Sequence, residues 1–187
     1  QDWTNSEIDG LFSLTQTIKL SERQPEKQSK TKALNRPLVA LLFFEPSTRT
    51  RMSFEMAAFR CGFGPVVFDG GPGSSLEKGE SIEDTIVNVA AMKPEFMVIR
   101  CPDSVPLKEL AATQSSMKIL NAGWGLVAHP TQALLDTMTM KDEFGNLVGK
   151  KLLIVGDVKH SRVASSHFEL FPKSGVQVAV CGPSEFL

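Results

Sequence analysis

Short apolar runs alternate with helix-forming segments along this chain, and no other feature limits its possible folds as much. Residues 37–44 and 95–99 are almost continuously apolar, as is typical of strands that are covered on both faces. Between such runs, apolar residues recur at helical spacing, as at Ile82, Ile86 and Val89. Strands that alternate with helices predict parallel sheets with right-handed crossovers, so we expect an α/β protein with doubly wound sheets.

Capping and turn residues mark where several of these elements begin and end. Ser6 and Ser81 are expected to cap helices, and Gly62 and Gly145 to end them. The polar segment 21–35 is typical of a loop, although it could contain a second helix. The strand at 150–157 is expected to be buried like the others. The expected helices are 6–20, 48–61, 81–93, 105–113, 130–144 and 161–171, and the expected strands are 37–44, 65–71, 95–101, 117–123, 150–157 and 176–182.

The pattern divides the chain into one complete domain and the start of another. Beyond Lys150 only two strands and one helix are expected, and two strands do not make a stable doubly wound layer. We therefore predict a complete domain at residues 1–140, a bridging helix at about 130–144, and an incomplete second domain at 150–187. Because the chain begins with Gln1 and not Met, we expect it to be part of a longer protein.

Composition argues against several classes of protein. The net charge is −1, so no overall positive field would attract nucleic acid. No apolar run reaches the ~18 residues of a membrane span, and we expect no signal peptide before the first helix. Three cysteines without metal-ligand spacing (Cys61, Cys101 and Cys181) predict reduced thiols in a cytoplasmic protein and no bound metal. Four residues of the helix at 48–61 are assigned to the core: Met52, Phe54, Met56 and Phe59.

Polar and cationic side chains follow the predicted strands at the ends where ligands bind. In an open parallel sheet, ligands bind in the crevice outside the carboxyl ends of the strands. Because the chain as a whole is nearly neutral, a local gathering of cations and hydroxyls predicts a small, multiply charged anion as ligand. The residues expected there are Ser47, Thr48, Arg49, Thr50, Arg51, Ser74, Ser75, Lys78, Arg100, His129, Thr131, Gln132, Asp157, Lys159, His160 and Arg162.

The segment from Ser47 to Arg51 is the most informative part of this set. A helix that begins near Ser47 directs unpaired backbone N–H groups and the positive end of its dipole at a bound anion. Arg49 can bind a phosphate through two parallel hydrogen bonds. The structural alternative is that Ser47 is an ordinary N-cap and that both arginines are solvated.

The other cations have structural alternatives as well. Lys78 could be a surface lysine, and His129, which precedes a proline, could be a simple capping residue. Arg100 at the end of a buried strand needs a partner, which is either a ligand or a structural ion pair. Arg162 falls in the first turn of a helix, where the dipole disfavours a cation and so favours an anionic partner.

Four motifs that occur in this order resemble the carbamoyltransferase superfamily. They are FFEPSTRTRMSFE at 43–55, SSLEKGESIEDT at 74–85, NAG…HPTQALLD within 121–136 and VGDVKHSRVA at 155–164. The resemblance extends over residues 37–182 and is closest to the aspartate carbamoyltransferase family, because ornithine enzymes carry Cys where this chain has Thr131. It implies transfer of the carbamoyl group of carbamoyl phosphate to the amine of L-aspartate, in pyrimidine biosynthesis, without a metal or organic cofactor.

The resemblance also implies roles for single residues. Glu45 would pair with an arginine of the site and hold it in place. Four residues would be catalytic: Arg49, Thr50, Arg100 and His129. Carbamoyl phosphate would be bound by Ser47, Thr48, Arg49, Thr50, Arg100, His129 and Gln132. L-aspartate would be bound by Lys78 and Arg162, and a neighbouring subunit of a homotrimer would supply Ser75 and Lys78.

Some features depart from the family pattern and keep alternatives open. Trp124 stands where an acidic residue is frequent and Ala128 where Gln or Glu is usual, and both could alter the packing of their loop. The chain ends before a second arginine-bearing segment and a His-Pro-Leu-Pro segment, so we expect it to catalyse little alone. The alternatives are a carbamoyltransferase for another amine such as ornithine, a non-catalytic anion-binding member, and a dinucleotide-binding module, for which VGDVKHS lacks the glycine spacing. Regulatory or dihydroorotase-type subunits are further candidate partners.

Overall fold

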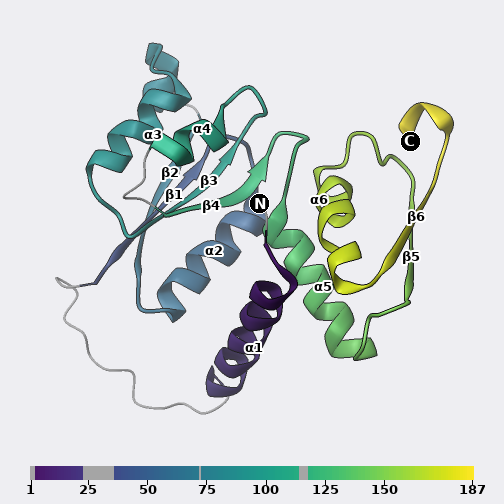
Figure 1. The fold of residues 1–187 in the computed structure, drawn as a ribbon. Helices are drawn as coiled ribbons and strands as arrows, with labels where there is room; N and C mark the ends of the chain where they lie inside the picture. The colour runs from purple at the N-terminus through teal and green to yellow at the C-terminus, as the bar shows by residue number, and fades with distance from the viewer. Residues whose placement is uncertain (1–2, 23–35, 72, 114–117) are drawn as a thin grey trace.

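The computed structural model describes residues 3–22, 36–71, 73–113 and 118–187, and it contains two parallel β-sheets with helices packed against them (Figure 1). The first sheet has the strand order β2-β1-β3-β4, and the second pairs β5 with β6. The predicted α/β fold with parallel sheets is therefore confirmed. The strands are β1 (Leu38–Phe43), β2 (Gly64–Asp69), β3 (Phe96–Cys101), β4 (Lys118–Trp124), β5 (Lys151–Val155) and β6 (Gln177–Cys181).

The helices follow the predicted alternation with the strands. They are α1 (Asn5–Glu22), α2 (Thr48–Arg60), α3 (Ile82–Ala91), α4 (Leu107–Thr113), α5 (Pro130–Phe144) and α6 (Arg162–Leu170), with short 3-10 turns η2 (Ser75–Lys78), η3 (Pro172–Ser174) and η4 (Ser184–Phe186). The second helix that the segment 21–35 could contain lies mostly outside the described residues.

The first sheet is buried on both faces because its central strands carry apolar side chains on both sides. In β1, Ala40 and Leu42 pack into a core with Ile86 of α3, whereas Leu41 and Phe43 pack into a second core on the other face. These strands need no polar–apolar alternation, which is why their sequences are continuous apolar runs. Sheet and helices together form the doubly wound layer that the sequence predicts.

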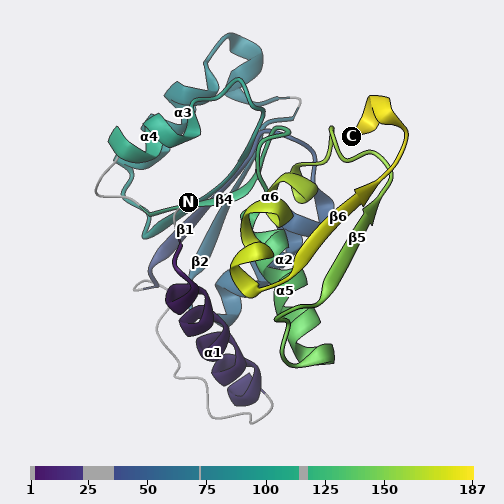
Figure 2. The same ribbon diagram turned by 45° about the vertical axis from the view of Figure 1, so that its right-hand side comes forward.

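Helix α5 lies between the two sheets, and α6 lies on the side of β5 and β6 that faces the first sheet (Figures 1 and 2). Met140 of α5 packs against the core of the second unit, which is built around Leu147, Phe171 and Val176. The other end of α5 begins directly after the loop that follows β4. The helix thus connects both units, while the division of the chain near residue 140 stays a prediction.

Several predicted helix ends are confirmed, and one is wrong. The Ser81 hydroxyl accepts a hydrogen bond from the Asp84 N–H at 3.0 Å, and Gly62 directly after α2 has a φ of +82°. Ser6, however, does not cap the first helix. Thr4 does, because its hydroxyl accepts from the Glu7 N–H while the Glu7 carboxylate accepts from the Thr4 N–H at 2.7 Å.

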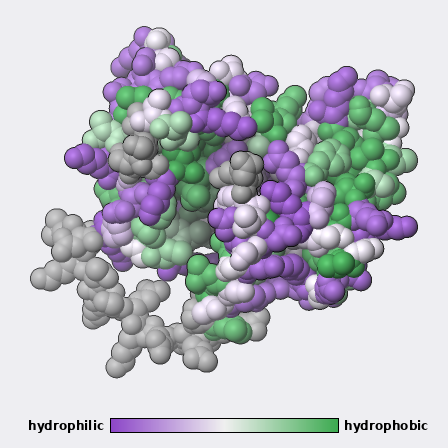
Figure 3. Space-filling model, in the orientation of Figure 1, coloured by the Kyte–Doolittle hydropathy of each residue, from purple (hydrophilic) through white to green (hydrophobic). Residues whose placement is uncertain are grey.

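Two predictions of burial are also wrong. Strand β5 was expected to be buried, but Leu153 and Val155 are 58% and 70% exposed, because α5 and α6 cover only one face of the two-stranded sheet. Hydrophobic residues, coloured green, are accordingly concentrated on the right of the surface, where β5 and β6 lie (Figure 3). On α2, only Phe54 of the four residues assigned to the core packs into it. Met52, Met56 and Phe59 lie on another side of the helix and are exposed.

Candidate functional site

The topology of the first sheet places a crevice at the carboxyl ends of β1 and β3. From β1 the chain moves to β2 on one side and later returns to β3 on the other. Ligands of open α/β sheets bind where the strand order reverses in this way. The two strand ends are joined by a hydrogen bond from the Phe44 N–H to the Arg100 carbonyl at 2.8 Å, so Glu45 and the Arg100 side chain emerge side by side.

A carboxylate and two guanidinium groups meet at this crevice. Glu45 Oε2 accepts a hydrogen bond from Arg162 Nη1 at 2.8 Å and lies 3.4 Å from Arg100 Nε. The longer contact is an ion pair without good hydrogen-bond alignment, since the buried Arg100 Nε makes no hydrogen bond within the described residues. The expected pairing of Glu45 with an arginine is confirmed, and it joins the first sheet to α6.

Within this small cluster there is more positive than negative charge. A Cβ on Gly123 would lie 2.8 Å from Arg100 Nη1 and 3.3 Å from Arg162 Nη1, so both guanidiniums lie close to the position that this Cβ would occupy. Burial and the neighbouring Arg162 lower the pKa of Arg100, and Glu45 only partly opposes them. One carboxylate against two arginines leaves a net positive charge, which an added anion would stabilise.

His129 lies buried beside these arginines, directly before α5. Its backbone N–H donates to Ser166 Oγ at 2.7 Å, and its Nδ1 lies 3.4 Å from Thr131 Oγ1. Burial, followed by the charges of Arg100 and Arg162, lowers the pKa of His129 to about 4. The imidazole is therefore neutral at pH 7. His129 does occupy the N-cap position of α5, as the structural alternative expects, but its side chain makes no capping hydrogen bond to the helix.

The amino end of α2 lies at the same edge, since Glu45 precedes it by three residues. Ser47 occupies the N-cap position with extended backbone, yet its hydroxyl makes no capping hydrogen bond to the helix. The first-turn N–H groups of α2 and the exposed Arg49 are thus available to an anion. Arg51 is engaged elsewhere, because it pairs with Asp69 at the end of β2.

Some of the predicted residues are not brought into the cluster. Ser75 and Lys78 lie in η2, where the Ser75 hydroxyl is the largest of the causes that lower the pKa of Glu80. Lys78 is exposed. His160 pairs with Asp157 at 3.0 Å in the loop before α6. A role of Ser75 and Lys78 in the site of a neighbouring subunit stays a prediction.

The two residues that depart from the family pattern shape the loop that carries His129. Trp124 donates its backbone N–H to the Ala128 carbonyl at 2.9 Å, which closes the loop as an isolated β-bridge. The Trp124 indole N–H donates to the Val105 carbonyl at 3.0 Å, and the ring packs against the first core. The large ring therefore anchors the loop, and whether it alters the packing relative to the family pattern stays a prediction.

The structure also shows functional candidates that sequence reasoning missed. Asp136 accepts a hydrogen bond from Gln132 Nε2 at 2.9 Å and contacts His167 Nε2 at 2.8 Å. The spacing of Gln132 and Asp136, four residues apart on one helix, was a usable signal. Ser166 and His167 carry no such signal, because they reach α5 only through the packing of α6.

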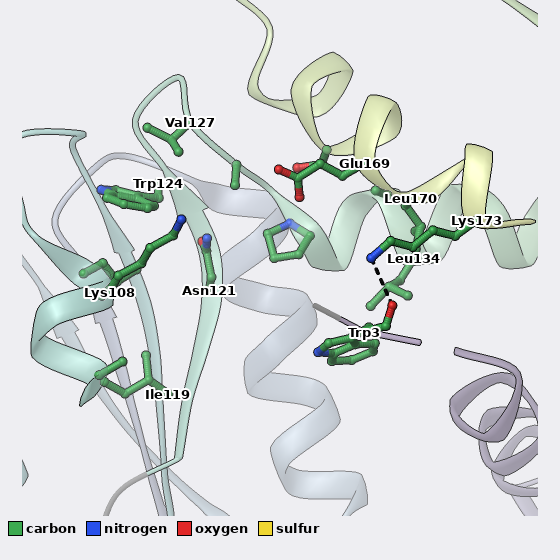
Figure 4. Close-up of a pocket in the computed structure, with 16 residues that line it drawn as sticks. Trp3, Lys108, Ile119, Asn121, Trp124, Val127, Leu134, Glu169, Leu170 and Lys173 are labelled. Carbon is green, nitrogen blue, oxygen red and sulfur yellow. Dashed lines mark hydrogen bonds between the residues drawn. The ribbon is translucent and has the colours of Figure 1, made fainter. Parts of the chain in front are cut away.

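A cavity formed by described residues includes neither Glu45 nor the two arginines of this cluster. It has a volume of about 480 Å³ and opens between β4, α4, α5 and α6 (Figure 4). Trp3, Lys108 and Trp124 line it, and Lys173 at its rim donates to the Trp3 carbonyl at 3.0 Å. Its wall is mostly apolar and holds neither Arg100 nor Arg162, so the site of a small anion is assigned to the crevice.

Replacement of Gly123 by alanine should test whether the positions of the two arginines require a residue without a side chain here. Its φ of +129° is unfavourable for other residues, so we expect a loss of about 1–3 kcal/mol in the free energy of unfolding. The new Cβ would also push the Arg100 guanidinium aside. Gly62→Ala is the matched control, because it has a positive φ but open space around it. Calorimetry should show weaker binding of inorganic phosphate for Gly123→Ala only; equal binding in both variants would contradict this.

Comparisons with known proteins agree with this geometry. The family described as "Aspartate/ornithine carbamoyltransferase, carbamoyl-P binding domain" matches residues 1–142. Among curated proteins, the aspartate carbamoyltransferase catalytic subunit of Deinococcus radiodurans is 44% identical over the whole chain, and that of Thermus aquaticus is also 44% identical. The chain spans 58% and 61% of the lengths of these two relatives.

Solved structures show the same similarity. An aspartate transcarbamoylase of Trypanosoma cruzi in complex with carbamoyl phosphate superposes with a TM-score of 0.84 at 30% identity, covering 98% of this chain and 56% of the other. The catalytic subunit of an M. Jannaschii aspartate transcarbamoylase gives a TM-score of 0.82 at 33% identity, covering 99% and 59%. The fold, the cluster at the strand ends and the relatives therefore all indicate the same family.

Proposed function

The chain belongs to the aspartate/ornithine carbamoyltransferase family, and we propose that the protein containing it is an aspartate carbamoyltransferase. It would transfer the carbamoyl group of carbamoyl phosphate to the amine of L-aspartate, giving N-carbamoyl-L-aspartate and phosphate for pyrimidine biosynthesis. The observation that carries this proposal is the meeting of Arg100, Arg162 and neutral His129 at the strand crossover. Such a site suits a doubly charged anion with a reactive carbonyl group.

We assign the binding of carbamoyl phosphate to the amino end of α2 and its surroundings. The hydroxyls of Ser47, Thr48 and Thr50, the first-turn N–H groups and the Arg49 guanidinium would hold the phosphate. The Ser47 hydroxyl supports this assignment because it is not used as a helix cap. Arg49 would also offset the charge that develops on the departing phosphate.

Three donors would polarise the carbamoyl carbonyl. Thr50, Arg100 and His129 would donate to its oxygen, on which negative charge builds in the tetrahedral transition state. His129 can do so as a neutral imidazole, because its pKa of about 4 keeps it uncharged at pH 7. Gln132 would accept a hydrogen bond from the carbamoyl NH₂ and fix its orientation.

The reaction then needs no covalent enzyme intermediate. Arg162 would bind a carboxylate of L-aspartate and present its amine to the carbonyl carbon. A C–N bond forms, the C–O bond to phosphate breaks with its electron pair leaving on phosphate, and the departing phosphate takes the proton that the amine loses. The protein contributes positioning and charge stabilisation.

The assembly belongs to the same proposal. Ser75 and Lys78 lie in η2 and form no ion pair with Glu45 or hydrogen bond to its two arginines among the described residues, which is compatible with a role in the site of a neighbouring subunit. We therefore propose a homotrimer with shared active sites in the cytoplasm. Regulatory or dihydroorotase-type subunits would be additional partners.

Product identification tests this function. The intact protein that contains this chain is incubated with carbamoyl phosphate and either L-aspartate or L-ornithine, and we expect carbamoyl-aspartate from the first mixture. Citrulline without carbamoyl-aspartate would replace the proposal with an ornithine enzyme, and no product from either amine would favour a non-catalytic member. Arg49→Ala should abolish most of the turnover; unchanged turnover would disprove the catalytic assignment.

A further inference from the structure

A chain of hydrogen bonds links Gln132 to the second unit of the protein. Gln132 Nε2 donates to one oxygen of Asp136 at 2.9 Å, and His167 Nε2 contacts the other oxygen at 2.8 Å. Gln132 and Asp136 lie one turn apart on α5, whereas His167 lies on α6. The carboxylate thus divides its two oxygens between an amide in the candidate site and an imidazole from the neighbouring helix.

This arrangement determines which way the Gln132 amide faces. An ionised carboxylate only accepts hydrogen bonds, so the group that faces Asp136 must be the amide NH₂ and not its oxygen. The Gln132 Oε1 atom accepts no hydrogen bond from any residue that the structure describes. It is therefore left as an acceptor for an N–H group of a ligand, which the NH₂ of a carbamoyl group would supply.

The side chain of His167 is fixed in a position from which it can take part in these hydrogen bonds. Its side chain is 14% exposed, and its ring stacks on Phe171 with the centroids 4.3 Å apart and the planes 13° apart. Because its partner is a carboxylate, Nε2 carries the proton in both the neutral and the charged imidazole. The hydrogen bond to Asp136 consequently persists whatever the charge of His167.

Asp136 would be less firmly placed without this contact. Its side chain is 31% exposed, and a carboxylate at that exposure can rotate into water and leave the amide without a fixed partner. His167 occupies the second oxygen and limits that rotation. The contact also joins α6, whose first residue Arg162 pairs with Glu45, to a second point on the wall of the site.

We propose that His167 is a positioning residue which, through Asp136, holds the Gln132 amide with its oxygen available to the carbamoyl NH₂. This inference rests on the proposed function for the identity of the ligand, but the orientation of Gln132 stands on the hydrogen bonds alone. Because His167 lies on α6 of the second unit, a movement of that unit would change the hydrogen bonds at the carbamoyl end of the site.

Two variants of His167 separate its hydrogen bond from its packing. His167→Phe keeps a flat ring on Phe171 but loses the donor, and we expect kcat/KM for carbamoyl phosphate to fall about tenfold in the intact enzyme. His167→Gln can place an Nε2 donor near the original position and should recover most of that loss. Phe168→Ala, an exposed neighbour on α6, is the control and should leave kcat/KM unchanged.

A double-mutant cycle tests whether His167 acts through Gln132. In a Gln132→Ala background, His167→Phe should have little further effect on kcat/KM, since the amide it positions is gone. Losses that multiply in the double variant would overturn the inference, because they would mean that His167 acts independently of Gln132. A loss in His167→Gln as large as in His167→Phe would also overturn it.

A measurement without catalysis separates this inference from the proposed function. With ¹⁵N-glutamine labelling of the intact protein, His167→Phe should shift the Gln132 side-chain NH₂ resonances and speed their exchange with water, and Phe168→Ala should not. Unshifted resonances would overturn the positioning role even in an active enzyme. Shifted resonances in a protein that forms no carbamoyl-aspartate would support the positioning and disprove the function.

Discussion

Replacement of Arg100 by methionine is expected to lower kcat of the intact enzyme by about 10²–10³-fold, the cost of losing one donor to a developing oxyanion. The same change should leave the free energy of unfolding within about 1 kcal/mol of the wild type, or raise it. Burial and the charge of Arg162 already make the charged form of Arg100 unfavourable. Glu45 would keep its 2.8 Å hydrogen bond with Arg162, so no carboxylate is left unpaired.

Activity and stability should therefore move independently in this variant. kcat is measured from the formation of carbamoyl-aspartate, and stability from urea unfolding of the same preparation. Arg36→Met is the matched control, because this exposed arginine precedes β1 at the opposite end of the strand. A variant that keeps wild-type kcat would show that Arg100 serves only as an ion-pair partner. A large loss of stability would show instead that the Glu45 cluster is mainly structural.

The convergence of Arg100 and Arg162 could be predicted because it depends on the topology of the sheet more than on exact side-chain positions. Arg100 lies at the end of a predicted strand and Arg162 opens the helix after another, and parallel strands bring such positions to one edge. The motif resemblance also predicted a pairing for Glu45. The distances within the cluster, and the use of one carboxylate by two arginines, required the structure.

Other features depend on contacts between distant elements, which a single sequence does not reveal. Met52 and Phe54 are both apolar residues of α2, yet only Phe54 faces the sheet, and helical spacing alone allows either side to be the buried one. Leu153 occupies a strand that is almost as apolar as β1, but its burial depends on a layer that covers it. The link between Asp136 and His167 likewise exists only because α6 packs on α5.

The pH dependence of stability provides the second large effect. The pKa of His129 is about 4 in the folded chain, below its ordinary value of 6.5, so the unfolded chain binds more protons between these values. The free energy of unfolding should thus fall as the pH is lowered from about 6.5 to about 4, by up to about 3 kcal/mol from this residue. Above pH 6.5 the contribution is fully present.

Two measurements check the cause of this effect. An NMR titration of the His129 ring should give a midpoint near 4, and His129→Gln should flatten the corresponding part of the stability curve. Inorganic phosphate should raise the pKa of His129, because an anion bound beside Arg100 offsets positive charge that, together with burial, keeps the imidazole neutral. A midpoint near 6.5 without phosphate would contradict a neutral His129 buried beside two arginines. A pKa that phosphate leaves unchanged would place the anion away from this crevice.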